Sequence, residues 1–165
     1  MPYHRSGIQL IDDQNRRKYI DQDERLRFIE ACYSSEATLK CFGLALLFTG
    51  GRISEVLSIC DKHVEVSANR VRIKTLKRRH STVIRHVPLP TWFIDMLSTT
   101  FDLKTNNAKF QSKLIWPWSR STASRKVKHL MELADIIGKQ ASAKGLRHGF
   151  GCTCNILWSS YFYSL

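Results

Sequence analysis

An apolar run between Thr38 and Phe48 is the feature that most constrains the fold of this chain. Its apolar members are Leu39, Phe42, Leu44, Ala45, Leu46, Leu47 and Phe48. A helix that is apolar on all sides has to be buried. Thr49-Gly50-Gly51 follows the run, and glycine readily adopts the positive φ at which a helix ends. The sequence therefore predicts a buried helix that stops at this glycine pair, in a chain of 165 residues that is long enough for a real core.

A second helix is predicted directly after the glycine pair, because Ile53, Val56, Leu57 and Cys60 recur at helical spacing. Arg52 would then lie in the first turn of that helix, where a cation is unfavourable against the helix dipole. A bound anion would offset this cost, because free backbone N–H groups would face it as well. An ion pair between Arg52 and Glu55 is the alternative explanation, and the two do not exclude each other.

The pattern changes to a period of two between Arg70 and Val87. Val71, Ile73 and Thr75 alternate with basic residues, and Val83, Ile84 and Val87 mark a returning strand. No acidic residue occurs between positions 67 and 94. A charge run is usually a solvated face. Because this hairpin lacks a compensating anion in its own sequence, we favour DNA contact by its seven Lys and Arg residues. The candidate DNA-binding residues among them are Arg70, Arg72, Lys74, Arg78 and Arg79.

Three further helices are expected around these elements. Asp21 and Glu24 form a capping box ahead of a helix over residues 22–33, whose apolar positions are Leu26, Ile29 and Tyr33. A short helix is expected over residues 90–97. Ser119 or Ser121 would cap a helix with an apolar face made by Ala123, Val127, Leu130, Met131 and Ala134, and a basic face made by Arg120, Arg125, Lys126 and Lys128.

Near the end of the chain, residues 143–150 combine two cations, an imidazole and two glycines. Glycine lets the backbone approach a ligand closely. Arg147 can bind a phosphate through two parallel N–H bonds, and Lys144 can add a point charge or a proton. A solvated basic turn at the start of a helix is the alternative interpretation of this stretch.

The overall charge narrows the possible partners. The chain has 26 Lys and Arg against 14 Asp and Glu, a formal net charge of +12. Such a balance indicates a polyanion, most commonly nucleic acid, although ribosomal and membrane-surface proteins can be as basic. The five cysteines lack zinc-site spacing, so we expect reduced thiols and no metal. No signal peptide and no membrane span is expected, and the predicted location is cytoplasmic.

Three stretches, taken in order, resemble the catalytic domain of the tyrosine recombinase (phage integrase) family. They are Thr49-Gly50-Gly51-Arg52-Ile53-Ser54-Glu55, the basic hairpin ending in Arg85-His86-Val87-Pro88-Leu89-Pro90, and Lys144-Gly145-Leu146-Arg147-His148. The resemblance implies an α+β fold, mainly helical with a small antiparallel β-hairpin or three-stranded sheet. We expect an N-terminal arm over residues 1–17, an incomplete catalytic domain over residues 18–151 and a divergent tail over residues 152–165.

The resemblance also implies a chemistry: a tyrosine attacks the scissile phosphate of double-stranded DNA, a 5′-hydroxyl leaves, and no metal or cofactor takes part. Arg52 and Arg147 match the family's phosphate-binding arginines. Lys77 matches its hairpin lysine, the proton donor to the leaving oxygen, with Arg78 and Lys74 as the fallback candidates. Lys144 matches a position held by His or Lys, where it could assist proton transfer. The helix with the basic face would lie in the major groove, and copies of the chain could associate on DNA.

The nucleophile is the part of the family pattern that the sequence does not match. Tyr161 and Tyr163 follow Arg147, but no Gly-His pair precedes them, so we expect neither to be the nucleophile. The uncharged stretch from Cys152 onward looks like a truncated or frame-shifted copy, and the family's smaller helical domain is not expected ahead of residue 18. We therefore do not expect the chain to complete recombination. Two hypotheses remain, a recombinase or integrase domain from a mobile element and an inactive DNA-binding remnant, with a basic RNA-binding protein as a third.

Overall fold

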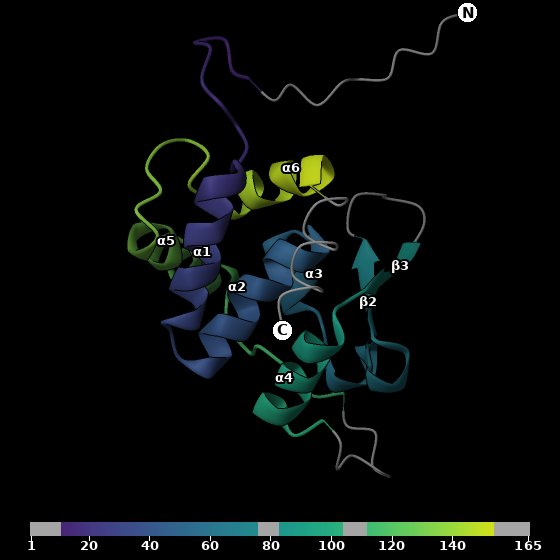
Figure 1. Cartoon of the computed structure of the whole chain (residues 1–165). Helices are drawn as coiled ribbons and strands as arrows, with labels where there is room; N and C mark the ends of the chain where they lie inside the picture. Colours follow the sequence, from purple (N-terminus) through teal and green to yellow (C-terminus); the bar gives the residue numbers. More distant parts are fainter. Residues whose placement is uncertain (1–10, 76–82, 104–111, 154–165) are drawn as a thin grey trace, which may run out of the picture.

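The computed structural model describes residues 11–75, 83–103 and 112–153, with side chains described as far as Phe150. Its helices and strands, in chain order, are α1 (Gln22–Tyr33), α2 (Ala37–Thr49), α3 (Ile53–Leu57), β1 (Val64–Glu65), β2 (Arg70–Thr75), β3 (Val83–Pro88), α4 (Thr91–Phe101), α5 (Arg120–Leu133) and α6 (Ala143–Thr153). The domain is mainly helical, with a small three-stranded antiparallel sheet on one side of the helices (Figure 1), which confirms the predicted fold class.

Helix α2 is the centre of the fold, as its apolar sequence predicts. It contacts α1, α3, α4, α5 and α6, and Phe42, Leu44 and Leu46 on its different sides are all at most 1% exposed. The helix ends at Gly50, which has a φ of 57° and donates its backbone N–H to the carbonyl of Leu46. Glycine suits this position because a side chain would strain a left-handed backbone.

Helix α1 has the predicted bounds but a different buried face. The capping box is present: the side chain of Asp21 accepts from the N–H of Glu24, and the side chain of Glu24 accepts from the N–H of Asp21. Of the three positions predicted to face the core, Ile29 is buried, whereas Leu26 and Tyr33 are 36% and 47% exposed. The core side is instead set by packing against α2 and α5, which buries Phe28 and Cys32 completely.

The sheet has the order β1-β2-β3, and β2 pairs with β3 in a register that places Ile73 opposite Arg85. The sequence predicted that no anion compensates the charge of this hairpin, and the structure shows that this prediction is wrong. Glu65 of β1 forms ion pairs with Arg70 and Arg72 of β2, and Arg85 of β3 lies 3.5 Å from Glu55 of α3. Both carboxylates lie outside the acid-free stretch of sequence, so only the fold brings them to the hairpin.

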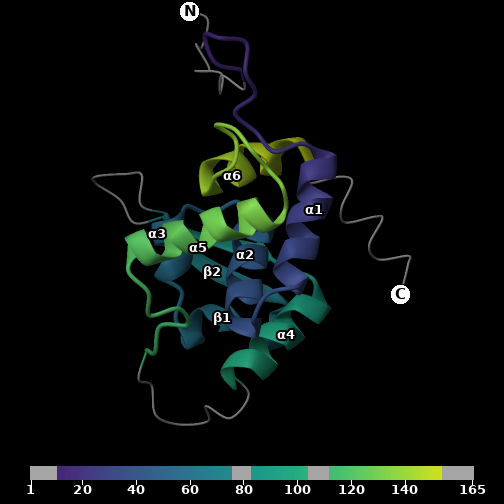
Figure 2. The same cartoon turned by 90° about the vertical axis from the view of Figure 1, so that its left-hand side faces the viewer.

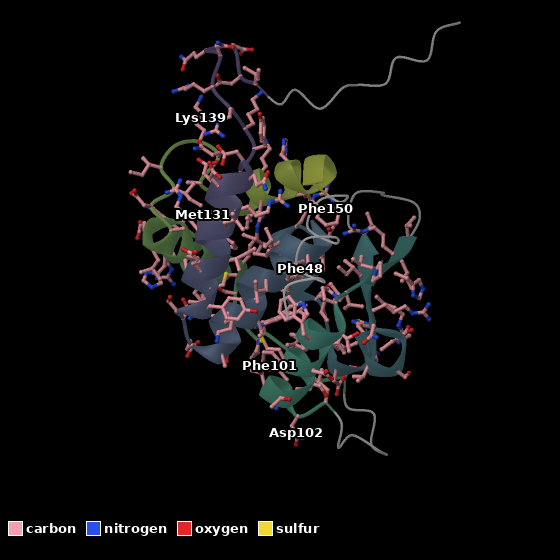
Figure 3. All side chains as sticks on the ribbon, in the orientation of Figure 1. Phe48, Phe101, Asp102, Met131, Lys139 and Phe150 are labelled. Atoms are coloured by element: carbon pink, nitrogen blue, oxygen red, sulfur yellow. The ribbon has the colours of Figure 1, made fainter. Side chains whose placement is uncertain are left out.

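Aromatic side chains fill the space between α2, α4 and the segment that precedes α5. Phe48 of α2, labelled in Figure 3, lies inside the domain. Its ring packs against Trp92 and Phe93 of α4, with centroids 5.6 Å and 5.4 Å away. Trp116 is 1% exposed, packs edge-on against Phe42 and donates its indole N–H to a carbonyl of α2 at 3.2 Å. Helix α4 continues to Phe101, past the predicted end at residue 97, and Phe101 packs edge-on against Trp116 with ring centroids 5.6 Å apart.

Helix α5 begins after Ser119, whose hydroxyl accepts from the N–H of Thr122 at 3.1 Å. It crosses α2 next to α1 (Figure 2). The apolar face predicted for this helix is confirmed, since each of its residues is at most 4% exposed: Ala123, Val127, Leu130, Met131 and Ala134. At its C-terminal end, Arg27 of α1 donates to the carbonyls of Ala134 and Asp135.

Helix α6 lies across the ends of α1 and α2 (Figure 1), and two of its glycines allow neighbouring backbone to approach closely. A Cβ added to Gly145 would lie 1.9 Å from the carbonyl oxygen of Gln140, and one added to Gly149 would lie 2.8 Å from the carbonyl oxygen of Ile20. The sequence suggested that these glycines let a ligand approach the backbone closely. The structure corrects this expectation, because the groups that approach them are carbonyl oxygens of the protein itself. Within the described parts of the chain, no helix is long and apolar enough to cross a membrane.

Candidate active site

A polar pocket of about 190 Å³ lies where α3, the sheet and α6 meet. The residues that line it come from four separate stretches of the chain: Gly50, Arg52 and Glu55 from the first, and then Thr75, Arg85 and Arg147. Three of these are arginines and one is a carboxylate, so the lining carries two net positive charges. The chemistry of the pocket is therefore that of an anion-binding site.

Arg52 is held at the pocket by Glu55. The residue is the N-cap of α3 and so lies just before the first turn in which it was predicted. Glu55 Oε1 accepts from the Arg52 guanidinium at 2.9 Å, and Glu55 Oε2 accepts from the Arg52 backbone N–H at 2.9 Å. The Glu55 side chain is 3% exposed, whereas that of Arg52 is 32% exposed. The predicted ion pair is thus present, and Arg52 still reaches the pocket.

Arg147 reaches the same pocket from α6, which lies near the other end of the sequence. Burial lowers its pKa from the usual value, and repulsion from Arg52 and Arg85 lowers it further, while the carboxylate of Glu55 opposes the change. An arginine keeps its charge at neutral pH even so. The structure therefore brings Arg52 and Arg147 together at one pocket. A bound anion would offset the electrostatic repulsion between them.

Arg85 also lines the pocket and was missed as a site residue in the sequence. The register places it opposite Ile73, which is completely buried, so its side chain lies on the inner face of the sheet. Val83, Arg85 and Val87 alternate along β3, with Arg85 between two apolar positions. An arginine at an inward position of a strand is a signal that could have identified this residue.

Thr75 supplies a hydroxyl to the wall of the pocket at the end of β2. Its Oγ1 is buried, and no hydrogen-bond partner for it occurs among the residues that the structure describes. A buried hydroxyl without a partner is unfavourable. A polar ligand in the pocket would therefore find an unused hydrogen-bonding group there.

The remaining candidate catalytic residues do not line this pocket or lie outside the described residues. Lys144 is exposed in the first turn of α6, where it helps to lower the pKa of His148, after the larger effect of burial. The residues that the structure does not describe include Lys77, Arg78, Arg79, Tyr161 and Tyr163.

The described members of the predicted DNA-binding set lie on two basic surfaces, one on β2 and one on α5, and none of them lines the pocket. On β2, Arg70, Arg72 and Lys74 alternate with the buried positions, so they face outward. On α5, Arg120, Arg125 and Lys128 are exposed, while the ammonium group of Lys126 lies 4.6 Å from the centre of the Trp118 ring. Among the described residues, no cluster of three or more His, Cys, Asp or Glu side chains could hold a metal ion.

Comparison with solved structures places this architecture among recombinases. The structure resembles XerA recombinase with a TM-score of 0.65 and 22% sequence identity, over 80% of this chain and 48% of that one. It resembles XerH site-specific recombinase bound to its difH substrate with a TM-score of 0.62 and 16% identity, over 85% of this chain and 47% of that one. These likenesses show the fold.

A third solved structure, a lambda integrase (75–356) dimer bound to a COC′ core site, resembles the chain with a TM-score of 0.58 and 18% identity, over 87% of this chain and 54% of that one. The chain thus spans about half the length of these proteins. A comparison with curated protein sequences finds no match. The sequence profile of the phage integrase family matches residues 18–155, and the chain therefore belongs to the phage integrase family.

Proposed function

We propose that this chain is the catalytic domain of a site-specific DNA recombinase or integrase, which binds double-stranded DNA and positions a scissile phosphate for cleavage and rejoining by a tyrosine. The observation that carries the proposal is the convergence of Arg52 and Arg147, 95 positions apart in the sequence, on one pocket with a net positive charge. Membership of the phage integrase family supports it independently.

The pocket suits the electrostatics of this reaction. When an oxygen attacks a phosphodiester, the five-coordinate transition state carries more negative charge than the ground state. Guanidinium groups held in place before the reaction stabilise such charge without reorganising. Arg52 is held by the buried Glu55 and Arg147 by its place on α6, so both could donate N–H bonds to the non-bridging oxygens.

Departure of the 5′-oxygen requires a proton. Lys77 is our proposed donor, because it follows β2 by two residues and the last residue of that strand, Thr75, lines the pocket. Lys144 is proposed to assist from the start of α6. A lysine can serve in this way if nearby cations or burial lower its pKa.

Contacts with the duplex would come from the two basic surfaces. We propose that the exposed face of α5 lies in the major groove, and that the outward arginines and lysine of β2 contact phosphates. Of the similar structures, the XerH recombinase is bound to a difH substrate, and the lambda integrase is a dimer bound to a COC′ core site. Association of two or more copies on DNA is proposed on this basis.

A second candidate is a DNA-binding role without strand cleavage. Among the described residues, the tyrosines are Tyr19 and Tyr33, and neither lines the arginine pocket. Tyr161 and Tyr163 lie outside the described residues, so the nucleophile is the untested part of the proposal.

A suicide substrate separates the two functions. The chain is incubated with a pool of nicked duplexes that release a short fragment after cleavage, and covalent protein–DNA adducts are resolved on a denaturing gel. The recombinase function predicts an adduct that Arg147→Gln abolishes, and loss of the adduct in Tyr161→Phe or Tyr163→Phe would identify the nucleophile. DNA binding without an adduct would favour the second candidate, and absence of DNA binding would refute both.

A further inference from the structure

The carboxylate of Glu55 is shared between two arginines of the pocket. It accepts two hydrogen bonds from Arg52 at 2.9 Å each, and its Oε2 lies 3.5 Å from the guanidinium of Arg85. Arg147 adds a third cation to the same lining. With Arg85 the lining carries two net positive charges, and without Arg85 it would carry one.

Neutralisation of Glu55 does not account for Arg85. Arg52 already supplies Glu55 with a guanidinium and a backbone donor. The Arg85 contact of 3.5 Å is longer than the roughly 2.7–2.9 Å of a charge-assisted hydrogen bond. The Arg85 side chain is 37% exposed although it lies on the inner face of the sheet, and it lines the pocket. Its planar group, with five N–H donors, therefore retains capacity for a ligand.

We propose that Arg85 is a third phosphate-binding arginine of this site and acts mainly on the transition state. The inference rests on the proposed function. A phosphodiester carries one negative charge, and the five-coordinate transition state carries about two. A lining with two net positive charges therefore matches the charge of the transition state better than that of the bound phosphodiester. Interactions that strengthen in the transition state accelerate the reaction, whereas those of equal strength in both states only improve binding.

The neighbourhood of Arg85 on the sheet supports a ligand there. Thr75 lies on the same face, and its buried Oγ1 has no partner among the described residues. The inner face is otherwise apolar at Val71, Ile73 and Val87. At the edge of an apolar face, a charged side chain and a buried hydroxyl without a partner among the described residues are unfavourable. A bound phosphate would supply a partner to the hydroxyl and a closer one to the guanidinium.

Two small anions test the charge match without requiring strand cleavage. Dimethyl phosphate is a phosphodiester with one negative charge, and methyl phosphate carries close to two at pH 7.5, because the second pKa of such an ester is about 6. Binding of each is measured by the shifts of backbone N–H signals of α3 and α6 in ¹H–¹⁵N NMR spectra. We expect the wild-type chain to bind methyl phosphate more tightly.

The Arg85→Gln variant removes the charge and keeps the approximate length. We expect it to lower affinity for methyl phosphate roughly tenfold and affinity for dimethyl phosphate no more than about threefold, as loss of a charge-assisted bond would. Arg85→Lys should keep the preference for methyl phosphate, and it serves as the folded variant if Arg85→Gln does not fold. Arg16→Gln makes the same charge change outside the pocket, where Arg16 pairs with Asp12 at 3.1 Å, and should lower affinity for both anions equally, by less than about twofold.

The outcomes separate this inference from the proposed function. If Arg52→Gln and Arg147→Gln abolish binding of both anions while Arg85→Gln behaves like Arg16→Gln, Arg85 is not a ligand and the phosphate site stands. Loss of the methyl phosphate preference in Arg85→Lys would also overturn the inference. If the wild-type chain binds neither anion, or if Arg52→Gln and Arg147→Gln change nothing, the phosphate site and the proposed function fail together with the inference.

Discussion

Glu55 binds Arg52 at two points, through the guanidinium and through the backbone N–H, each at 2.9 Å. The first contact orients the side chain at the pocket, and the second caps α3. One buried carboxylate therefore joins the start of a helix to the placement of a candidate catalytic group. Because Glu55 is also close to Arg85, its loss would release two arginines at once.

Glu55→Gln is expected to destabilise the domain by about 2–4 kcal/mol, because three guanidinium groups would face one another without their buried carboxylate. Added phosphate should raise the unfolding temperature of this variant more than that of the wild type, since an anion would replace the missing charge. Glu132→Gln is the matched control, because Glu132 is exposed on α5 at 3.9 Å from Lys128. Thermal unfolding with and without phosphate is the measurement, and equal phosphate effects in both variants would contradict the prediction.

Gly145→Ala should destabilise the protein, although alanine normally favours a helix by about 1 kcal/mol. The new Cβ would lie 1.9 Å from the Gln140 carbonyl oxygen, and backbone cannot move aside as a flexible side chain can. We expect a loss of roughly 1–3 kcal/mol from overpacking and weaker phosphate binding, because α6 carries Arg147. Urea unfolding measures the first effect. Ser124→Ala, on the exposed side of α5, should be neutral or slightly stabilising, and a stabilised Gly145→Ala would refute the packing argument.

DNA affinity should depend strongly on salt, with a contribution from the exposed face of α5. If Arg125 neutralises one phosphate, Arg125→Gln should make the slope of log K against log salt less steep by about 0.9. Lys139→Gln removes the same charge from the loop before α6, where Lys139 pairs with Asp12 at 2.9 Å, and should leave the slope unchanged. Fluorescence anisotropy across a salt series gives the slopes. Identical slopes for Arg125→Gln and the wild type would place the DNA elsewhere.

Stability should fall between pH 7.5 and pH 5.5 because of two histidines. Burial lowers the pKa of His148, with Lys144, Arg147 and Lys18 adding to the effect, and burial together with Arg72 lowers that of His63. A lowered pKa means that the unfolded chain binds protons first. The stabilising contribution is therefore complete above the unfolded value of about 6.5 and is lost as the pH falls toward the folded values.

The pH effect is measured by urea unfolding at the two pH values. His148→Gln should reduce the difference in unfolding free energy between them, whereas His129→Gln, on the exposed side of α5, should preserve it. Carboxylates with lowered pKa values, such as Asp21 and Glu65, stay ionised across this range and do not contribute. An unchanged pH dependence in His148→Gln would remove this histidine from the explanation.

Local signals in the sequence predicted the elements that depend on local interactions. The capping box of Asp21 and Glu24 marked the start of α1, because both of its hydrogen bonds form within one helical turn. The apolar run of α2 and the glycine after it located a buried helix and its end, since burial on all sides and a left-handed backbone each require particular residue types. The apolar face of α5 followed from its helical spacing in the same way.

The rotation of α1 and the charge balance of the hairpin were not predictable in this way. Helical spacing alone chose Leu26 and Tyr33 for the core, but contact with α2 and α5 selects Phe28 and Cys32. Glu65 compensates Arg70 and Arg72 because β1 pairs with β2, and an acid-free window in the sequence cannot reveal a partner on a neighbouring strand.

The sequence by itself determined the buried helix and its end, the start of α1, the basic charge and, through its motifs, the two arginines proposed to bind phosphate. Only the tertiary structure decided which groups share one pocket. Arg85 enters it because the register of β2 and β3 places it opposite a buried isoleucine, and Glu55 can hold two arginines because α3 packs against the sheet. The reason is physical: electrostatic interactions depend on distance in space and on burial, and the order of residues along the chain specifies neither until the core has packed.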